Sequence, residues 1–475
     1  MTDAAALALN LFNSGKYRDA EHMAAQVIAA QPGLAVAYYI HGLSLDRQGR
    51  VTEARQSLKK AVSLLPKEAS FRAALVYVSH KAGLNAQAMT HAEAVLKTLP
   101  TDQLTLLTLA NAQTLSGDLA AGLKTYGRIL AVDPANVLAL GNAARLEGLL
   151  GQDAGADAHL AAAAKIAPQD TDIAHIAADL KLLKALRGAL PHSGAAPPAP
   201  ETVGLLDALT PADGRKTSVV FFHIAQQGAH PVQKYQAGET VDYIDVLGKS
   251  VAAARLAIAG CRIVLLTDSD SVYPDLGIDV VARLPAKRDW IMYERLRMQQ
   301  AFSASALMTE NVLFLDTDIM LNRSFKDVFA REFDVGLTWR ANPLMPINGG
   351  MILGKKGLGL QAFLTACLSA YEALPGNPAT GERYGFDVRA FQGDQLALAA
   401  AVNWQVPPPA SRRVGDARVT YFSCEQFNYN FSPARDPDIL AEKYAVHFKG
   451  GVAKGFAGEF LMRKQRGIHS DRPMR

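Results

Sequence analysis

The sequence predicts a multidomain protein in which an all-α helical solenoid precedes an α/β domain. A 34-residue period runs through the first 170 residues, a Pro/Ala-rich segment follows it, and short apolar strands then alternate with helical patterns. With 475 residues, the chain also exceeds what one ordinary hydrophobic core accommodates. We expect the solenoid at residues 1–190, a linker at 191–215 and the α/β domain at 216–475.

The first part of the chain repeats one structural unit five times. In the first unit, helices are expected at residues 7–14 and 17–30. A glycine permits the turn between the two helices, a small residue lets them approach, and a proline ends the second helix. The residues that recur with the 34-residue step are Gly15, Gly49, Gly83, Gly117 and Gly151, then Ala20, Ala54, Ala88, Gly122 and Ala156, then Pro32, Pro66, Pro100, Pro134 and Pro168.

This pattern resembles the tetratricopeptide repeat, whose unit is 34 residues long. Residues 171–190 predict one further helix that would cap the solenoid, because Ile173, Ile176, Leu180 and Leu183 lie on one face. The resemblance implies a concave face that binds a protein or peptide partner. The alternative is a spacer or a surface for self-association.

Composition and charge are those of a soluble globular protein, with 49% hydrophobic and 20% charged residues. Cys261, Cys367 and Cys424 lack zinc-site spacing and predict free thiols. We find no signal-peptide pattern and no apolar run of roughly 18 residues, so we expect a cytoplasmic protein.

Residues 443–475 carry eight basic and two acidic side chains. Such a tail could contact the inner membrane face, hold a nucleotide diphosphate or be a solvated end, and nothing indicates nucleic-acid binding.

The second half predicts a mostly parallel sheet covered by helices. Continuous apolar runs, which are typical of buried parallel strands, occur at 218–225, 262–268, 280–284 and 311–315. Helical patterns lie between them, at 243–259 and 293–307. In a sheet of this kind, ligands bind at the carboxyl ends of the strands.

The strongest candidate site follows the run that begins at Asn311. Asp316 and Asp318 follow this run at the expected strand end, where side-chain alternation would point both carboxylates to the same side. Paired carboxylates suit a hard divalent ion, Mn²⁺ or Mg²⁺, that keeps positions open for phosphate oxygens. An acidic strand-to-loop junction without a ligand is the alternative.

Later segments add three groups of candidates. Asn348 and two glycines are expected before a short strand, either as sugar contacts or as a plain turn. Asp394 and Gln395 follow a glycine at an expected helix start, where Asp394 would be either functional or an N-cap. His447 ends an apolar strand and leads into a loop with Lys454, and beside a carboxylate pair we interpret it as a ligand.

The order of these motifs resembles glycosyltransferase family 8, retaining enzymes that include glycogenin and bacterial lipopolysaccharide galactosyltransferases. The resemblance covers roughly residues 243–456, and the five motifs in order are more specific than any one of them. They are Tyr-x-Arg-Leu at 293–296, Leu-Asp-Thr-Asp at 315–318, Asn-Gly-Gly at 348–350, Gly-Asp-Gln at 393–395 and His-Phe-x-Gly at 447–450.

The resemblance implies an A-type glycosyltransferase fold, a Rossmann-like α/β domain, that transfers a sugar from a nucleotide-sugar donor. A UDP-sugar is the expected donor, the acceptor is a glycan or a protein recruited by the repeats, and anomeric configuration is retained through either a covalent intermediate or same-face attack. The implied residues are Asp316, Asp318 and His447 for Mn²⁺ (or Mg²⁺), Tyr243, Arg295, Asn348, Gly349, Gly450 and Lys454 for substrate, and Asp394 and Gln395 for catalysis.

The chain departs from the family in two loops. Residues 223–230 replace the acidic loop that contacts the nucleotide base, and Lys454-Gly-Phe456 stands where the family often has Lys-Pro-Trp.

Two other functions fit parts of the pattern. A haloacid-dehalogenase-type phosphatase also has Asp-x-Asp after an apolar strand, but Met320 stands where those enzymes have Thr or Val. The second alternative function is that of a tetratricopeptide scaffold with an inactive transferase domain.

Overall fold

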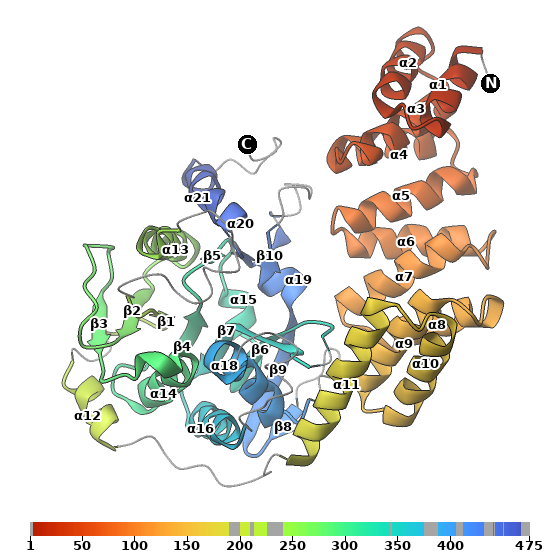
Figure 1. The fold of residues 1–475 in the computed structure, drawn as a ribbon. Coiled ribbons are helices and arrows are strands. Elements are labelled where there is room, and N and C mark those ends of the chain that lie inside the picture. Colours follow the sequence, from red (N-terminus) through yellow and green to blue (C-terminus); the bar gives the residue numbers. More distant parts are fainter. Residues whose placement is uncertain are drawn as a thin grey trace.

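The computed structural model describes residues 3–189, 200–209, 213–225, 241–342, 344–374, 388–404, 412–431, 440, 442–449 and 451–466. A stack of helices lies beside an α/β domain (Figure 1). The predicted all-helical repeat solenoid is confirmed. Its helices are α1 (Asp3–Asn13), α2 (Tyr17–Ala30), α3 (Ala35–Arg47), α4 (Val51–Leu64), α5 (Ala69–Lys81), α6 (Asn85–Leu96), α7 (Gln103–Ser116), α8 (Leu119–Val132), α9 (Val137–Leu150), α10 (Asp153–Ile166) and α11 (Thr171–Ala189).

The repeated glycines and small residues act as the sequence predicts. All five turn glycines have a positive φ, between 75° for Gly151 and 98° for Gly117, a conformation that other residues rarely adopt. At the small-residue position, Ala54 and Ala88 are fully buried between paired helices. The helix α11 packs on α9, where Gly148 leaves the space that the buried Leu180 fills.

The second half contains a mixed eight-stranded sheet in the order β3-β2-β1-β4-β7-β6-β9-β8, and a three-stranded sheet in the order β10-β11-β5. The expected parallel arrangement holds for β3-β2-β1-β4 and for β6 with β9, whereas β7 and β8 run antiparallel to their neighbours. The strands are β1 (Thr217–Phe222), β2 (Arg262–Thr267), β3 (Val280–Arg283), β4 (Asn311–Leu315), β5 (Ile319–Leu321), β6 (Val335–Trp339), β7 (Ile347–Lys355), β8 (Arg412–Val414), β9 (Ala417–Ser423), β10 (Tyr429–Asn430) and β11 (Ala445–His447).

Helices cover both faces of the large sheet because successive side chains of each strand point to opposite sides. In β1, Val219 and Phe221 join the cluster of Leu247 from α13, while Val220 joins the cluster of Phe302 from α14. The helices of this half are α12 (Pro200–Asp207), α13 (Tyr243–Ala257), α14 (Ile291–Ala304), α15 (Lys326–Phe329), α16 (Leu358–Ala373), α18 (Val388–Ala401), α19 (Cys424–Phe427), α20 (Gly451–Gly455) and α21 (Ala457–Gln465).

Three local expectations differ from the structure. Asn348 and its two glycines lie inside the nine-residue strand β7, not before a strand. Asp394 lies in the middle of α18 and is therefore not an N-cap. The linker region contains the helix α12, whose Leu206 is fully buried and whose Asp207 carboxylate accepts a hydrogen bond of 2.7 Å from the backbone N–H of Ala306.

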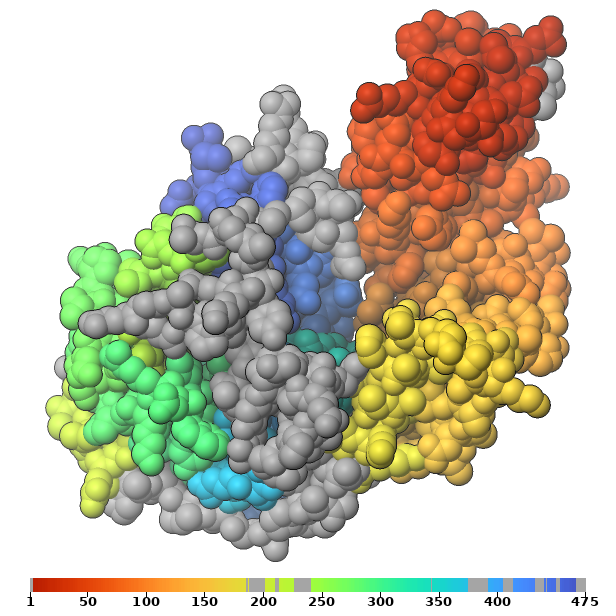
Figure 2. Space-filling view, in the orientation of Figure 1, coloured from red at the N-terminus to blue at the C-terminus, as the bar shows by residue number. Residues whose placement is uncertain are grey.

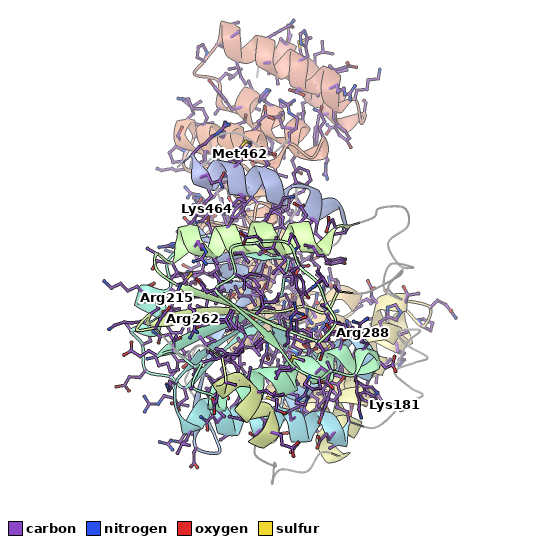
Figure 3. All side chains as sticks on the ribbon, turned by 90° about the vertical axis from the view of Figure 1, so that its left-hand side faces the viewer. Lys181, Arg215, Arg262, Arg288, Met462 and Lys464 are labelled. Atoms are coloured by element: carbon purple, nitrogen blue, oxygen red, sulfur yellow. The ribbon has the colours of Figure 1, made fainter. Side chains whose placement is uncertain are left out.

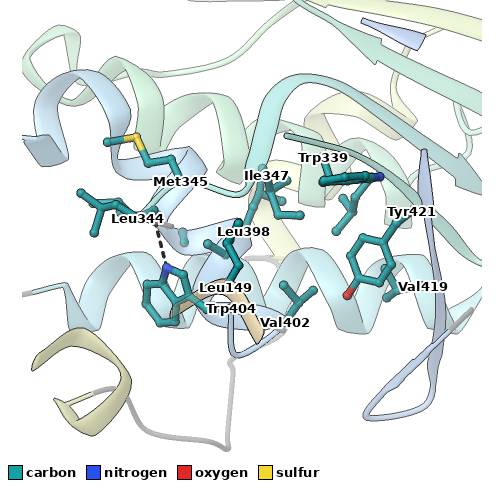
Figure 4. Packing of buried hydrophobic residues seen from close by; sticks show 14 of the residues in the cluster. Leu149, Trp339, Leu344, Met345, Ile347, Leu398, Val402, Trp404, Val419 and Tyr421 are labelled. Carbon is teal, nitrogen blue, oxygen red and sulfur yellow. Dashed lines mark hydrogen bonds between the residues drawn. The ribbon is translucent and has the colours of Figure 1, made fainter. Parts of the chain in front are cut away.

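The solenoid lies against the α/β domain (Figure 2), and the two share one hydrophobic cluster. Leu149 of α9 belongs to the same cluster as Trp404, which follows α18 (Figure 4). A Cβ atom on Gly117 would lie only 2.6 Å from Cζ2 of Trp339, so the turn after α7 touches the indole ring. The two parts therefore meet at an apolar contact formed by the edge of the solenoid that carries these turns.

Some basic side chains of the C-terminal segment make contacts within the α/β domain. Lys464, labelled on α21 in Figure 3, donates a hydrogen bond of 2.6 Å to the carbonyl of Asn322. Lys443 is buried, with its ammonium 4.7 Å from the ring centre of Tyr429.

None of the helices in the described part of the chain combines the length and the apolar character needed to cross a membrane. All three cysteines are free thiols, as the sequence predicts.

Candidate functional site

The two aspartates converge through a tight turn, not through strand alternation. Asp316 and Asp318 lie in the turn between β4 and β5, at the carboxyl end of β4. The backbone N–H of Asp316 donates to the carbonyl of Gly350 on β7 at 2.8 Å. The hydroxyl of Ser250 on α13 donates to the carbonyl of Thr317 at 2.6 Å. Contacts from a strand and a helix therefore fix the backbone that carries both carboxylates.

His447 completes a group of three possible metal ligands. Ligand atoms of Asp316, Asp318 and His447 all lie within 4.8 Å of one another. The Nδ1 atom of His447 lies 3.1 Å from the side-chain oxygen of Asn428, and the amide of Asn428 donates to the hydroxyl of Thr338 at 3.4 Å. An imidazole proton on Nδ1 satisfies the oxygen of Asn428, and Nε2 is the ring nitrogen that faces the carboxylates.

Lys454 of α20 lies against the same carboxylate group. Its ammonium is 2.8 Å from Oδ2 of Asp318, and the Nε2 atom of His447 is 3.2 Å from Oδ1. Burial acts to raise the pKa of Asp318, but His447 and Lys454 outweigh it and hold that pKa below its ordinary value. The ammonium also lies 5.3 Å from the ring centre of Tyr243, which places the start of α13 at the site.

Arg295 of α14 connects the metal-ligand group with α18. Its guanidinium is 2.7 Å from Oδ1 of Asp316 and 3.2 Å from Oδ2 of Asp394, and it donates to the carbonyl of Gly349 at 2.5 Å. Both Arg295 and Asp394 are buried. Burial raises the pKa of Asp394 to about 6 although Arg295 acts to lower it, and the negative charge of Asp316 adds to the rise.

The glycines of β7 allow the chain to pass close to these carboxylates. A Cβ atom on Gly349 would lie 2.9 Å from Oδ2 of Asp394, and one on Gly350 would lie 2.8 Å from Oδ2 of Asp316. The side-chain oxygen of the buried Asn348 accepts the backbone N–H of Gly350 at 2.9 Å. Asn348 thus fixes the local strand geometry within the site.

We expect Gly350→Ala to keep the fold but to weaken Mn²⁺ binding about tenfold, because the new methyl group would displace the carboxylate of Asp316. The loss of stability should stay within about 1 kcal/mol, since the nearest atom is the end of a flexible side chain. Titration with Mn²⁺ and thermal unfolding measure the two effects. Wild-type Mn²⁺ affinity in a folded variant would contradict a coordinating role for Asp316.

Most of the predicted site residues lie at this strand end. Tyr243, Arg295, Asn348, Gly349, Lys454, Asp394 and Gln395 are joined to the metal-ligand group by the contacts above, and Gln395 adjoins Asp394 on α18. Gly450 lies outside the described residues.

Sequence reasoning missed three supporting residues: Ser250, Asn428 and Arg340, whose Nη2 atom donates to Oε1 of Gln395 at 2.8 Å. Of these, Arg340 had a detectable signal, because it directly follows the segment 335–339 that forms the buried strand β6.

A second polar group lies at the carboxyl ends of β1 and β2. The ring of His223 is 3.0 Å from the hydroxyl of Tyr273, and burial lowers the pKa of His223 to about 4. The buried Asp268 accepts two hydrogen bonds from Arg288, at 2.6 and 2.9 Å. Residues 226–230 of the loop that departs from the family pattern lie outside the described residues.

No family model matches the chain, and no curated protein matches its sequence. The solved structures that resemble it include a MamA fragment from Desulfovibrio magneticus RS-1, which is 19% identical over 36% of this chain and 99% of that chain, with a TM-score of 0.34. YrrB, described as a TPR protein with an unusual peptide-binding site, is 18% identical over 36% of this chain and 89% of that chain, with a TM-score of 0.34.

A tetratricopeptide repeat protein from Parabacteroides merdae is 18% identical over 39% of this chain and 74% of that chain, with a TM-score of 0.35. YrrB and the Parabacteroides merdae protein are both described as tetratricopeptide repeat proteins.

Proposed function

We propose that the α/β domain is a metal-dependent glycosyltransferase that moves a sugar from a nucleotide diphosphate donor, with a UDP-sugar as the expected donor. The observation that carries the proposal is the convergence of Asp316, Asp318 and His447 at the carboxyl end of β4. Two cationic side chains, Lys454 and Arg295, lie directly against this group. A site with two carboxylates and adjacent cations suits a donor whose diphosphate is bound through a divalent ion.

The donor set fits Mn²⁺ or Mg²⁺. Asp316 and Asp318 offer oxygen ligands, and the contact with Asn428 orients His447 so that Nε2 is the available nitrogen. When bound, the ion would supply positive charge to offset the donor diphosphate. The parallel order β3-β2-β1-β4, with the aspartates at the end of β4, supports the A-type glycosyltransferase fold that the motifs imply.

Lys454 and Arg295 have different tasks in this proposal. Departure of the nucleotide diphosphate develops negative charge, which a cation placed beforehand stabilises more than it stabilises the ground state. Lys454, on the short helix α20, supplies this charge at the diphosphate. Arg295 is buried and bound at three points, so it holds Asp316 and the backbone of Gly349 in place.

Gln395 is the group of α18 that we assign to the donor sugar. Asp394 is 3% exposed and paired with Arg295, so its role in this proposal is to position Arg295. Gln395 is less buried, and its amide oxygen would stabilise positive charge on the sugar as the diphosphate leaves. Transfer in this proposal retains the anomeric configuration.

A polypeptide is the acceptor or docking partner that the solenoid favours. The solenoid shares a hydrophobic cluster with the α/β domain, so a chain bound on the repeats would be held close to the transferase site. Helical repeat arrays offer extended surfaces for such binding.

Thermal unfolding with Mn²⁺ and a panel of UDP, GDP, ADP and CMP tests the proposed function. We expect a rise in the midpoint only with Mn²⁺ and UDP together, equivalent to about 2.7 kcal/mol of stability at 100 times the dissociation constant. Asp318→Ala should abolish this rise. Glu332→Ala, which removes a carboxylate with an 87% exposed side chain, is the matched control and should keep it.

Other outcomes would point to the alternative functions. No shift with any nucleotide would favour a tetratricopeptide scaffold with an inactive transferase domain. Metal-dependent hydrolysis of phosphomonoesters without nucleotide binding would favour a phosphatase.

A further inference from the structure

We propose that Arg340 is a positioning residue for Gln395, and that the solenoid holds Arg340 in place through its neighbour Trp339. The inference rests on the proposed function and extends it, because it makes the geometry of the transferase site depend on the docked repeat array. It is carried by a continuous series of contacts from the turn after α7 to α18.

Arg340 joins the loop after β6 to the site. Its Nε atom donates to the carbonyl of Met345 at 3.0 Å, and its Nη2 atom donates to Oε1 of Gln395 at 2.8 Å. Its backbone N–H donates to the carbonyl of Pro346 at 2.8 Å. Because the guanidinium is planar and presents its donors in a fixed fork, these bonds together set the direction of the Gln395 amide. An amide oxygen has two acceptor positions, so one remains for substrate.

The solenoid contacts the residue that precedes Arg340. Trp339 ends β6 and is 5% exposed, with its ring against Gly117 of the turn after α7. The neighbouring strand β9 contacts the same turn, because Ser423, which pairs with Trp339, donates from its hydroxyl to the carbonyl of Leu115 at 3.4 Å. Two adjacent strand ends therefore meet one solenoid turn.

The loop between β6 and β7 is also tied to the end of α18. The indole N–H of Trp404 donates to the carbonyl of the buried Leu344 at 2.9 Å, as Figure 4 shows. The side-chain oxygen of Asn342 accepts the backbone N–H groups of Leu344 and Met345, at 3.1 and 2.9 Å. The described residues of this loop thus link the solenoid contact to the helix that carries Gln395.

The side chains of Trp339 and Arg340 can contact different parts of the protein because consecutive side chains at a strand end point in opposite directions. Trp339 meets the solenoid, and Arg340 meets α18. A shift of the indole ring would move the backbone of Arg340 and turn the amide of Gln395 away from the sugar. Docking of the solenoid and alignment of the reaction centre are therefore coupled.

Turnover and binding measured separately test the role of Arg340. Probes are UDP binding by calorimetry at saturating Mn²⁺, and Mn²⁺-dependent hydrolysis of UDP-glucose and UDP-galactose. We expect Arg340→Ala to lower kcat about tenfold or more, as small misplacements at a reaction centre do, while the Kd of UDP changes less than about twofold. Arg340→Lys should recover part of the loss. The double variant with Gln395→Ala should fall no lower than Gln395→Ala alone.

A pair of glycine variants tests the part played by the solenoid. Gly117 and Gly151 occupy the same repeat position, with φ of 98° and 75°, so alanine is similarly strained at both. Only at Gly117 would the new methyl group meet the ring of Trp339, because nothing lies within 4 Å of a Cβ on Gly151. We expect Gly117→Ala to lower kcat as Arg340→Ala does, and Gly151→Ala to leave kcat unchanged.

Crystal structures of the wild type and of Arg340→Ala give a readout that does not depend on turnover. The Gln395 side chain should change its rotamer in the variant. An unchanged rotamer, additive losses in the double variant, or equal effects of the two glycine variants would each overturn the inference while the proposed function stands. A wild-type protein that binds no nucleotide with Mn²⁺ would instead overturn the proposed function, and this inference with it.

Discussion

Replacing Lys454 with alanine is expected to strengthen Mn²⁺ binding to the free protein and to weaken the binding of UDP. The ammonium of Lys454 lies 2.8 Å from Oδ2 of Asp318, so it neutralises the carboxylate that the ion would use. An arriving cation must displace it, and the variant removes this competitor. With the ion bound, the same ammonium is available to the diphosphate, and loss of a charge-assisted hydrogen bond costs about 1.5–3 kcal/mol.

Calorimetric titration with Mn²⁺ alone, and then with UDP at saturating Mn²⁺, measures the two opposite effects. We expect UDP affinity to fall roughly 10-fold or more, in line with that free energy. Lys464→Ala is the matched control, because Lys464 bonds to the carbonyl of Asn322 and forms no ion pair with any carboxylate among the described residues. Mn²⁺ affinity that stays the same or falls in Lys454→Ala would refute the competition.

Trp404→Ala should be the most destabilising single change in the contact region between solenoid and α/β domain. Trp404 is 1% exposed and packs in the cluster that also contains Leu149 of the solenoid. Its removal leaves a large cavity and an unpaired carbonyl at Leu344, so a loss of about 3–5 kcal/mol is expected. The change should lower the denaturant midpoint of both parts of the chain together.

Denaturant unfolding followed by far-ultraviolet circular dichroism measures this effect. Trp290→Ala removes the same side chain at a position that is 39% exposed, and it should cost much less. If the two variants lost the same stability, the shared cluster would not be the main contact between the two parts. An α/β transition that stays unchanged in Trp404→Ala would show that they unfold independently.

The sequence determined the features that depend on local physical rules. The 34-residue step fixed the helix pairs because each turn needs a residue with positive φ, and Gly117 and Gly151 supply it. The apolar runs located β1, β2, β3 and β4 to within a few residues, since buried parallel strands require them. The same runs indicated that Asp316 and Asp318 stand at a strand end.

The local setting of the site depended on contacts between distant segments. Asn348 was expected before a strand but lies inside β7, because pairing with β6 extends that strand to Ile347, with Thr338 opposite Asn348. Asp394 lies within α18, not at its start. Asp316 and Asp318 converge through a turn held by Ser250 and Gly350, not through strand alternation.

Only the tertiary structure brought the supporting residues to the site. Asn428 faces His447 because β10 pairs with β11, and Arg340 reaches Gln395 because the loop after β6 folds onto α18. Trp404 has a left-handed backbone, with φ of 49°, that its sequence would not suggest. Each feature is stabilised by partners distant in the chain, whereas periodicity and turn chemistry record only what a segment requires of its own neighbours.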